Sequence, residues 1–168
     1  HSIGLNETEL PSFLKPIHPL AEFELGEQPR ALDYCRALAV ILRSTPVERI
    51  HFHNLGYYIS LERDPWTSRE TSRDALLFAA TMASARAQNG LFSSLNDIEK
   101  GKNAEVSEIG IQELSQLAKE LDQPHLFETG IGTFEEWNLY MVPTRLVKKP
   151  LFTVGLGDTI SAGAFLTA

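Results

Sequence analysis

The chain has 168 residues, of which 43% are hydrophobic and 22% charged, and this is enough for one domain with a buried core. A formal net charge of −7 argues against nucleic acid and anionic membrane surfaces as partners. The sequence has no apolar run of about 18 residues and no basic-then-apolar start, so we expect neither a membrane span nor a signal peptide. The single cysteine, Cys35, cannot form an intramolecular disulfide. We therefore expect Cys35 to be a core residue of a cytoplasmic protein.

The first part of the chain predicts alternating strands and helices. A strand end at residues 2–5 precedes a short helix that begins near Asn6 and that Pro16 and Pro19 should end. Pro29 suits the start of a second helix. The remaining patterns are helical spacing over 31–42, a strand over 49–54 and a possible continuation over 57–61.

The second part continues the alternation. A long helix over 72–87 is apolar nearly all round and should end at Asn89-Gly90. Amphipathic helices follow at 96–100 and 108–121, then strands at 137–143 and 151–154, and a helix of small residues from Thr159. Such alternation predicts an α/β fold with a mainly parallel sheet flanked by helices.

A glycine motif follows the last predicted strand. "TVGLGDTIS" places Gly155 and Gly157 between that strand and a helix, which is the layout of a phosphate cradle. A P-loop would need a lysine after the glycines, and the dinucleotide fingerprint would need glycine where Ile160 stands. What remains is Gly-x-Gly-Asp at the start of a helix.

Two interpretations of Asp158 stay open from the residues alone. The carboxylate could be a simple N-cap of the helix. It could instead accept a hydroxyl proton during phosphoryl transfer while the backbone amides hold the growing negative charge.

"NETE" near the start of the chain also supports two interpretations. Asn6 and Glu9 are three residues apart, which is the spacing of a capping box. A carboxylate here could also hold Mg²⁺ through water, the usual mode for that ion. Both can hold at once.

The two histidines of "RIHFHN" share one face of the predicted strand. His51 and His53 are two residues apart, and side chains alternate along a strand. They could bind Zn²⁺ or Cu²⁺ with a third ligand such as His125, but no other histidine or cysteine is near in sequence.

Taken together, "LNETE", "RIHFHNLGYY" and "TVGLGDTISAGAF" resemble the ADP-dependent sugar kinases of the ribokinase-like superfamily. The stretches "RDALLFAA" and "VPT" fit the same pattern, so the resemblance covers most of the chain. It implies the C-terminal, nucleotide-binding part of a ribokinase-like large domain over residues 1–168.

The resemblance also implies an activity and site residues. The family transfers the β-phosphate of ADP to a hydroxyl of glucose or fructose 6-phosphate in glycolysis, requires Mg²⁺ and releases AMP. Asp158 would be the catalytic base, and Asn6 with Glu9 would organise the metal. The amides of the anion hole would be those of Gly155, Leu156 and Gly157, and the nucleotide pocket would be lined by His51, His53, Asn54, Tyr57, Val142, Pro143 and Thr144.

Family members are more than twice as long as this chain. Their N-terminal part supplies the first strands, an H-x-E metal motif and a small lid domain with most sugar contacts. We therefore expect this chain alone to be inactive and to need that missing half as a partner. Two further hypotheses remain: a non-catalytic nucleotide-binding or regulatory domain, and a plain α/β domain whose helix caps mimic the motifs.

Overall fold

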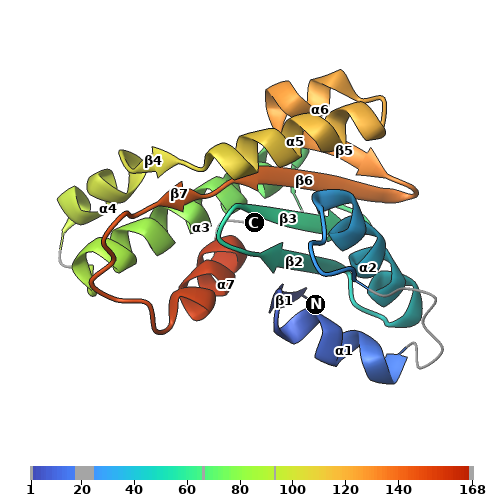
Figure 1. Ribbon diagram of the computed structural model, residues 1–168, viewed down its shortest axis with the longest axis horizontal. Coiled ribbons are helices and arrows are strands. Elements are labelled where there is room, and N and C mark those ends of the chain that lie inside the picture. Colours follow the sequence, from blue (N-terminus) through green and yellow to red (C-terminus); the bar gives the residue numbers. More distant parts are fainter. Residues whose placement is uncertain (1, 18–24, 66, 93, 167–168) are drawn as a thin grey trace.

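The computed structural model describes residues 2–17, 25–65, 67–92 and 94–166. A five-stranded sheet runs through the middle of the molecule with helices on both faces (Figure 1). Its strand order is β1-β2-β3-β6-β5. The bounds are Ser2–Asn6 for β1, Arg49–His53 for β2, Tyr57–Glu62 for β3, Trp137–Pro143 for β6 and Ile131–Phe134 for β5. The predicted α/β class is confirmed.

The strand directions differ from the predicted mainly parallel arrangement. Only β1 and β2 pair in parallel, whereas β2–β3, β3–β6 and β6–β5 are antiparallel. Short connections explain two of these antiparallel pairs, β2–β3 and β5–β6. Residues 54–56 join β2 to β3, and residues 135–136 join β5 to β6 with Glu135 at a φ of 54°. Loops of this length allow only antiparallel hairpins.

Side chains alternate between the two faces of the sheet. Ile50 and Phe52 of β2 point into the larger apolar core with the helices α1 (Glu9–Ile17), α2 (Ala31–Ser44), α5 (Glu108–Glu120) and α6 (Pro124–Thr129). The other face packs against α3 (Arg69–Asn89) and α7 (Leu156–Leu166). It carries His51, His53 and further polar groups among its apolar ones. The strand period therefore separates an apolar face from a polar one.

The remaining elements lie at one end of the molecule, on the left in Figure 1. They are α4 (Leu95–Lys102) and the two short strands β4 (Glu105–Val106) and β7 (Arg145–Leu146), which pair antiparallel. The segment after β7 runs back along α3 to reach α7. Its backbone N–H groups at Leu151 and Phe152 donate to the carbonyl of Ala87.

That contact explains why the predicted strand at 151–154 is wrong. The segment bonds to the end of α3 instead of joining the sheet, and its apolar side chains are exposed. The helix expected from Thr159 begins earlier, at Leu156. Pro16 lies inside α1, which ends at Ile17, and Pro19 lies outside the described residues.

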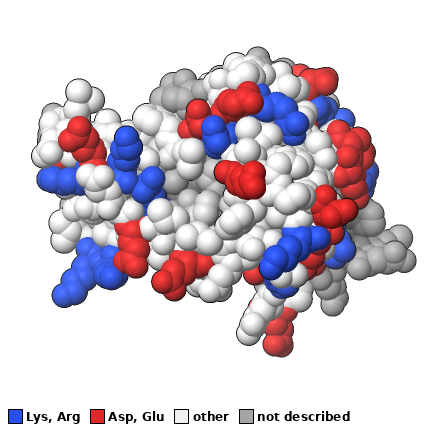
Figure 2. All heavy atoms as spheres, turned by 90° about the horizontal axis from the view of Figure 1, so that it is seen from above, with Lys and Arg blue, Asp and Glu red and all other residues white. Residues whose placement is uncertain are grey.

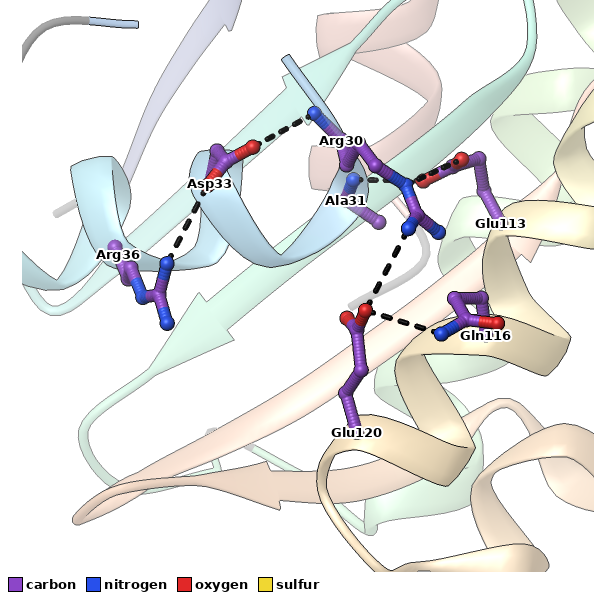
Figure 3. A network of polar contacts seen from close by, with 7 residues as sticks. All are labelled: Arg30, Ala31, Asp33, Arg36, Glu113, Gln116 and Glu120. Carbon is purple, nitrogen blue, oxygen red and sulfur yellow. Dashed lines mark hydrogen bonds and ion pairs between the residues drawn. The ribbon is translucent and has the colours of Figure 1, made fainter.

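A polar network fastens the start of α2 to α5 (Figure 3). Glu113 accepts a hydrogen bond from the backbone N–H of Ala31 at 2.8 Å and from Arg30 Nε at 3.2 Å. Arg30 also reaches Glu120 at 3.5 Å. Because the first N–H groups of a helix have no partner within it, Glu113 caps α2 from another element.

The surface carries both charge signs. On the face shown in Figure 2, acidic and basic side chains are interspersed over the described residues. Among these residues, no helix is both long enough and apolar enough to cross a membrane.

Candidate functional site

The ends of three neighbouring strands form one wall of a pocket. In the sheet register, Asn6 of β1 lies beside His53 of β2, which lies beside Tyr58 of β3. These side chains face the α3 and α7 side and line a pocket of about 390 Å³, the main pocket. The rest of its lining is Glu7, Thr8, Asn54, Leu55, Ala83, Ser84, Ala87, Thr144, Arg145, Leu146, Val147, Pro150, Thr153, Leu156, Gly157 and Ile160. Five separate parts of the chain therefore meet there.

The first turn of α7 forms another wall. Gly155 turns the chain with a φ of 73°, and its carbonyl accepts from the backbone N–H and the hydroxyl of Thr159 at 3.1 and 2.9 Å. The amides of the next residues have no acceptor within the helix. Leu156 and Gly157 line the main pocket, at the positive end of the helix dipole. This geometry suits an anionic group.

The interpretation of Asp158 as an N-cap is wrong. Because α7 begins at Leu156, Asp158 is the third residue of the helix, within its first turn. Its side chain is exposed. Neither Asp158 nor Gly155 is part of the main pocket's lining, although both adjoin residues that are.

The predicted capping box at the start of α1 is confirmed. The side chain of Asn6 accepts from the backbone N–H groups of Thr8 and Glu9 at 2.9 Å, and Glu9 accepts from the N–H of Asn6 at 3.0 Å. Glu9 uses one carboxylate oxygen for this contact and is exposed. Glu7, which the motif did not single out, lines the main pocket.

His51 and His53 share the polar face of β2, as predicted, but differ in position. His53 lines the main pocket and is 8% exposed. Burial lowers its pKa, and the carboxylates of Glu9 and Glu7 oppose that shift. His51 lies deeper, outside the pocket lining, and burial lowers its pKa to about 3 with help from His53 and Arg49. It is therefore neutral at physiological pH.

Tyr57 and Tyr58 point to opposite faces of β3. Tyr58 lines the main pocket, with its ring 6.1 Å from that of His53. Tyr57, the residue expected beside the adenosine, packs in the core on the opposite side of the sheet and lines a smaller side pocket of about 220 Å³. The side pocket shares Glu7, Asn54 and Leu55 with the main pocket.

Of the "VPT" segment, only the last residue lines the main pocket. Thr144 lines the main pocket, and its hydroxyl donates to the carbonyl of Leu55 at 2.7 Å. Val142 is buried in the core under α3, and Pro143 is half-buried at the end of β6. The structure thus brings together Asn6, His53, Asn54, Thr144, Leu156 and Gly157 from the predicted set.

Some pocket residues were missed by sequence reasoning. Strand alternation could have identified Tyr58, because it pairs with His53 across the hairpin. Arg145 and Ser84 carry no local signal, since only the packing of α3 beside β7 brings them to the pocket. Within the described residues, no group of three or more His, Cys, Asp or Glu side chains is placed so that it could hold a metal ion.

Comparison with known proteins gives a consistent result. Residues 1–167 match the family described as "ADP-specific Phosphofructokinase/Glucokinase conserved region". The chain is 38% identical over 172 residues to the ADP-dependent glucose/glucosamine kinase of Pyrococcus abyssi (strain GE5 / Orsay), and the match covers 99% of this chain and 36% of that protein. It is 34% identical to the ADP-specific phosphofructokinase of Methanosarcina acetivorans, again over 99% of this chain and 36% of the relative.

Solved structures agree. An ADP-dependent kinase in complex with fructose-6-phosphate and ADPβS superimposes with a TM-score of 0.86 at 35% identity, covering 99% of this chain and 38% of that one. A phosphofructokinase from Pyrococcus horikoshii OT3 with AMP gives 0.80 at 32%, covering 99% and 36%. The chain thus spans little more than a third of the length of these relatives. With its strand-end pocket, its Gly-x-Gly-Asp turn and a match over nearly its whole length, the chain belongs to the ADP-specific phosphofructokinase/glucokinase family.

Proposed function

We propose that this chain is the C-terminal, nucleotide-binding part of a ribokinase-like kinase domain that uses ADP as its phosphoryl donor. The observation that carries the proposal is the main pocket, where the first turn of α7 meets the ends of β1 and β2. Relatives whose names describe ADP-dependent kinases match the chain over its length. The adenosine would lie in the apolar part of the pocket, and the phosphates would face Leu156 and Gly157.

The proposed reaction is transfer of the β-phosphoryl group. The acceptor hydroxyl oxygen forms a bond to the β-phosphorus, and the bond from that phosphorus to the bridging oxygen of AMP breaks. Asp158 accepts the hydroxyl proton, and AMP leaves with the bonding electron pair. The amides of Gly155, Leu156 and Gly157 stabilise the charge on the transferred group, the main demand of this chemistry.

Mg²⁺ would be held through water by Glu9, and Asn6 would orient that carboxylate through the capping box. The fit rests on the exposed carboxylate of Glu9, which has one oxygen outside the capping box. Mg²⁺ typically takes one or two carboxylates, with water and substrate phosphates completing its shell. When bound, the ion would neutralise part of the phosphate charge.

The acceptor is a sugar or sugar phosphate, fructose 6-phosphate or glucose. Relatives named for each substrate match the chain to a similar degree. In the proposal, most sugar contacts come from the portion of the family's length that this chain does not span.

The test has two parts. Calorimetric titration of the full-length protein with ADP, AMP and ATP, with and without Mg²⁺, should give clearly tighter binding of ADP and AMP than of ATP. Turnover with glucose and fructose 6-phosphate should then release AMP. Binding without transfer would indicate a nucleotide-binding regulatory domain, and the absence of both would overturn the proposal.

A further inference from the structure

Helix α7 is held against the sheet at two points one helical turn apart. Gly157 and Ser161 are four residues apart, so they lie on the same face of the helix and are separated by about 6 Å along its axis. Below them, the rings of His53 and His51 are 6.3 Å apart on β2. The spacing of the two histidines therefore matches the spacing of the two helix positions.

The deeper point of contact is a hydrogen bond. His51 Nε2 lies 3.2 Å from the hydroxyl of Ser161, and His51 is only 3% exposed. Room for the pair comes from the neighbouring strand. A Cβ at Gly4 would lie 2.3 Å from His51 Nε2 and 2.5 Å from Ser161 Oγ, so any side chain there would have to displace the pair. The contact is thus built into three elements: β1, β2 and α7.

The second point of contact is steric. His53 Nε2 lies 3.3 Å from the position that a Cβ of residue 157 would take. The ring of His53 fills the space left by that glycine and borders the main pocket. A shift of α7 toward the sheet is blocked there, while a slide along its axis would break the bond between His51 and Ser161.

We propose that His51 and Ser161 are positioning residues that set how far α7 extends toward the pocket. This inference rests on the proposed function, because it concerns the placement of the amides at 155–157. His51 is outside the pocket lining, so it acts through Ser161 and the helix. If α7 slid along its axis by even a fraction of a turn, the amides at 155–157 would move away from their present positions beside Asn6 and His53 at the strand ends.

The test compares His51→Ala, Ser161→Ala and the double variant in the full-length protein. Each single variant should lower kcat for transfer from ADP by about tenfold or more, since misplacement of this kind acts on the reacting geometry. The KM for ADP should change by less than about threefold. The double variant should be no worse than His51→Ala, because both changes remove the same contact.

Two further variants sharpen the test. His51→Gln places an amide near the lost Nε2 and should restore at least half of kcat. Ser60→Ala is the matched control, because Ser60 lies beside His51 in the same row of the sheet and is equally buried. Its hydroxyl has no hydrogen-bond partner within the described residues, so its loss should leave kcat unchanged. If His51→Ala fails to fold, the kcat of Ser161→Ala, which removes a single hydroxyl, tests the proposal by itself.

Hydrogen exchange of the segment 155–165 separates this inference from the proposed function. Exchange should be faster in His51→Ala and Ser161→Ala than in Ser60→Ala, whether or not the protein turns over. If the unmodified protein neither binds ADP nor transfers phosphate, the proposed function fails, and unchanged exchange in these variants would overturn the positioning role as well. In an active protein, unchanged kcat or a rise in KM alone would overturn it.

Discussion

Gly110 of α5 lies directly against the backbone of Gly56 in the turn between β2 and β3. A Cβ added at Gly110 would stand 2.2 Å from the carbonyl oxygen of Gly56 and 2.9 Å from Cα of Pro143. Because both neighbours are backbone atoms, neither can rotate away. The start of α5 therefore supports the turn whose residues Asn54 and Leu55 border both pockets.

Gly110→Ala should consequently destabilise the protein. Overpacking of this kind costs about 1–3 kcal/mol in the free energy of unfolding, beyond what alanine gains in helix propensity. Chemical denaturation followed by tryptophan fluorescence measures it. Gly26→Ala is the control, since a Cβ at Gly26 meets no atom within 4 Å, and equal stability of the two variants would contradict the packing described.

Glu113→Ala should weaken the attachment of α2. The variant loses the acceptor for the first N–H of that helix and for Arg30, and loss of a helix cap typically costs about 1 kcal/mol. Glu120→Ala removes an exposed ion pair with Arg30 and an exposed hydrogen bond from Gln116, and it should cost less than about 0.5 kcal/mol. Equal urea midpoints for the two variants would mean that Glu113 does not act as the cap.

Asp158→Asn should abolish transfer but keep nucleotide binding. The amide has the same size and cannot accept the hydroxyl proton, so we expect kcat of the full-length protein to fall about a hundredfold or more. The AMP affinity measured by calorimetry should stay within about threefold, because the backbone amides remain. Asp122→Asn, an exposed carboxylate at a φ of 53° where asparagine is tolerated, should leave both unchanged. Normal turnover by Asp158→Asn would exclude the base role.

Tyr58→Leu and Tyr57→Leu compare the two aromatic residues of β3 as nucleotide contacts. Since Tyr58 lines the main pocket, its replacement should weaken AMP binding by about fivefold or more through loss of aromatic contact. Tyr57→Leu should change the affinity less than about twofold while lowering stability, because Tyr57 packs in the core with Tyr34. If Tyr57→Leu instead weakened AMP binding more than Tyr58→Leu, Tyr57 would be the residue that contacts the adenosine.

The buried His51 predicts a loss of stability in mild acid. Its folded-state pKa of about 3 lies below the ordinary value of 6.5, so its stabilising contribution is complete above pH 6.5 and is lost as the pH falls toward 3. Over that window the unfolded chain binds a proton that the native protein does not, which lowers the free energy of unfolding by up to about 1.4 kcal/mol per pH unit. Between about pH 5 and 6.5, His51→Gln should show a shallower decline in urea unfolding than the unmodified protein. Parallel curves for His51→Gln and the unmodified protein would contradict the assignment.

Local patterns in the sequence predicted local geometry well. The shared face of His51 and His53 follows from the strand period, and the Asn6–Glu9 capping box follows from a spacing of three. Gly90 ends α3 with a φ of 80°, as its position after an asparagine indicated. In each case the interacting groups are neighbours in sequence, so residue propensity and spacing are enough to predict the geometry.

Contacts between residues far apart in the sequence could not be predicted from local patterns. The predicted strand at 151–154 bonds to Ala87 of α3 instead, and Glu113 caps a helix that begins 82 residues earlier. The main pocket joins the ends of β1 and β2 to α3, β7 and α7, which only the complete packing brings together. Motif resemblance identified several of its residues but assigned the aromatic wall to Tyr57, on the far face of the sheet.

The separation of the sheet into an apolar and a polar face also limits which insertions and deletions the protein can tolerate in β2. A one-residue shift in the register of all of β2, as an insertion just ahead of Arg49 would impose, would move Arg49, His51 and His53 into the larger core and turn Ile50 and Phe52 toward the pocket. A one-residue insertion of this kind would therefore disrupt both the core and the pocket. A two-residue insertion would keep each side chain on its own face. In a library of insertions and deletions, tolerance along β2 should therefore alternate between odd and even lengths.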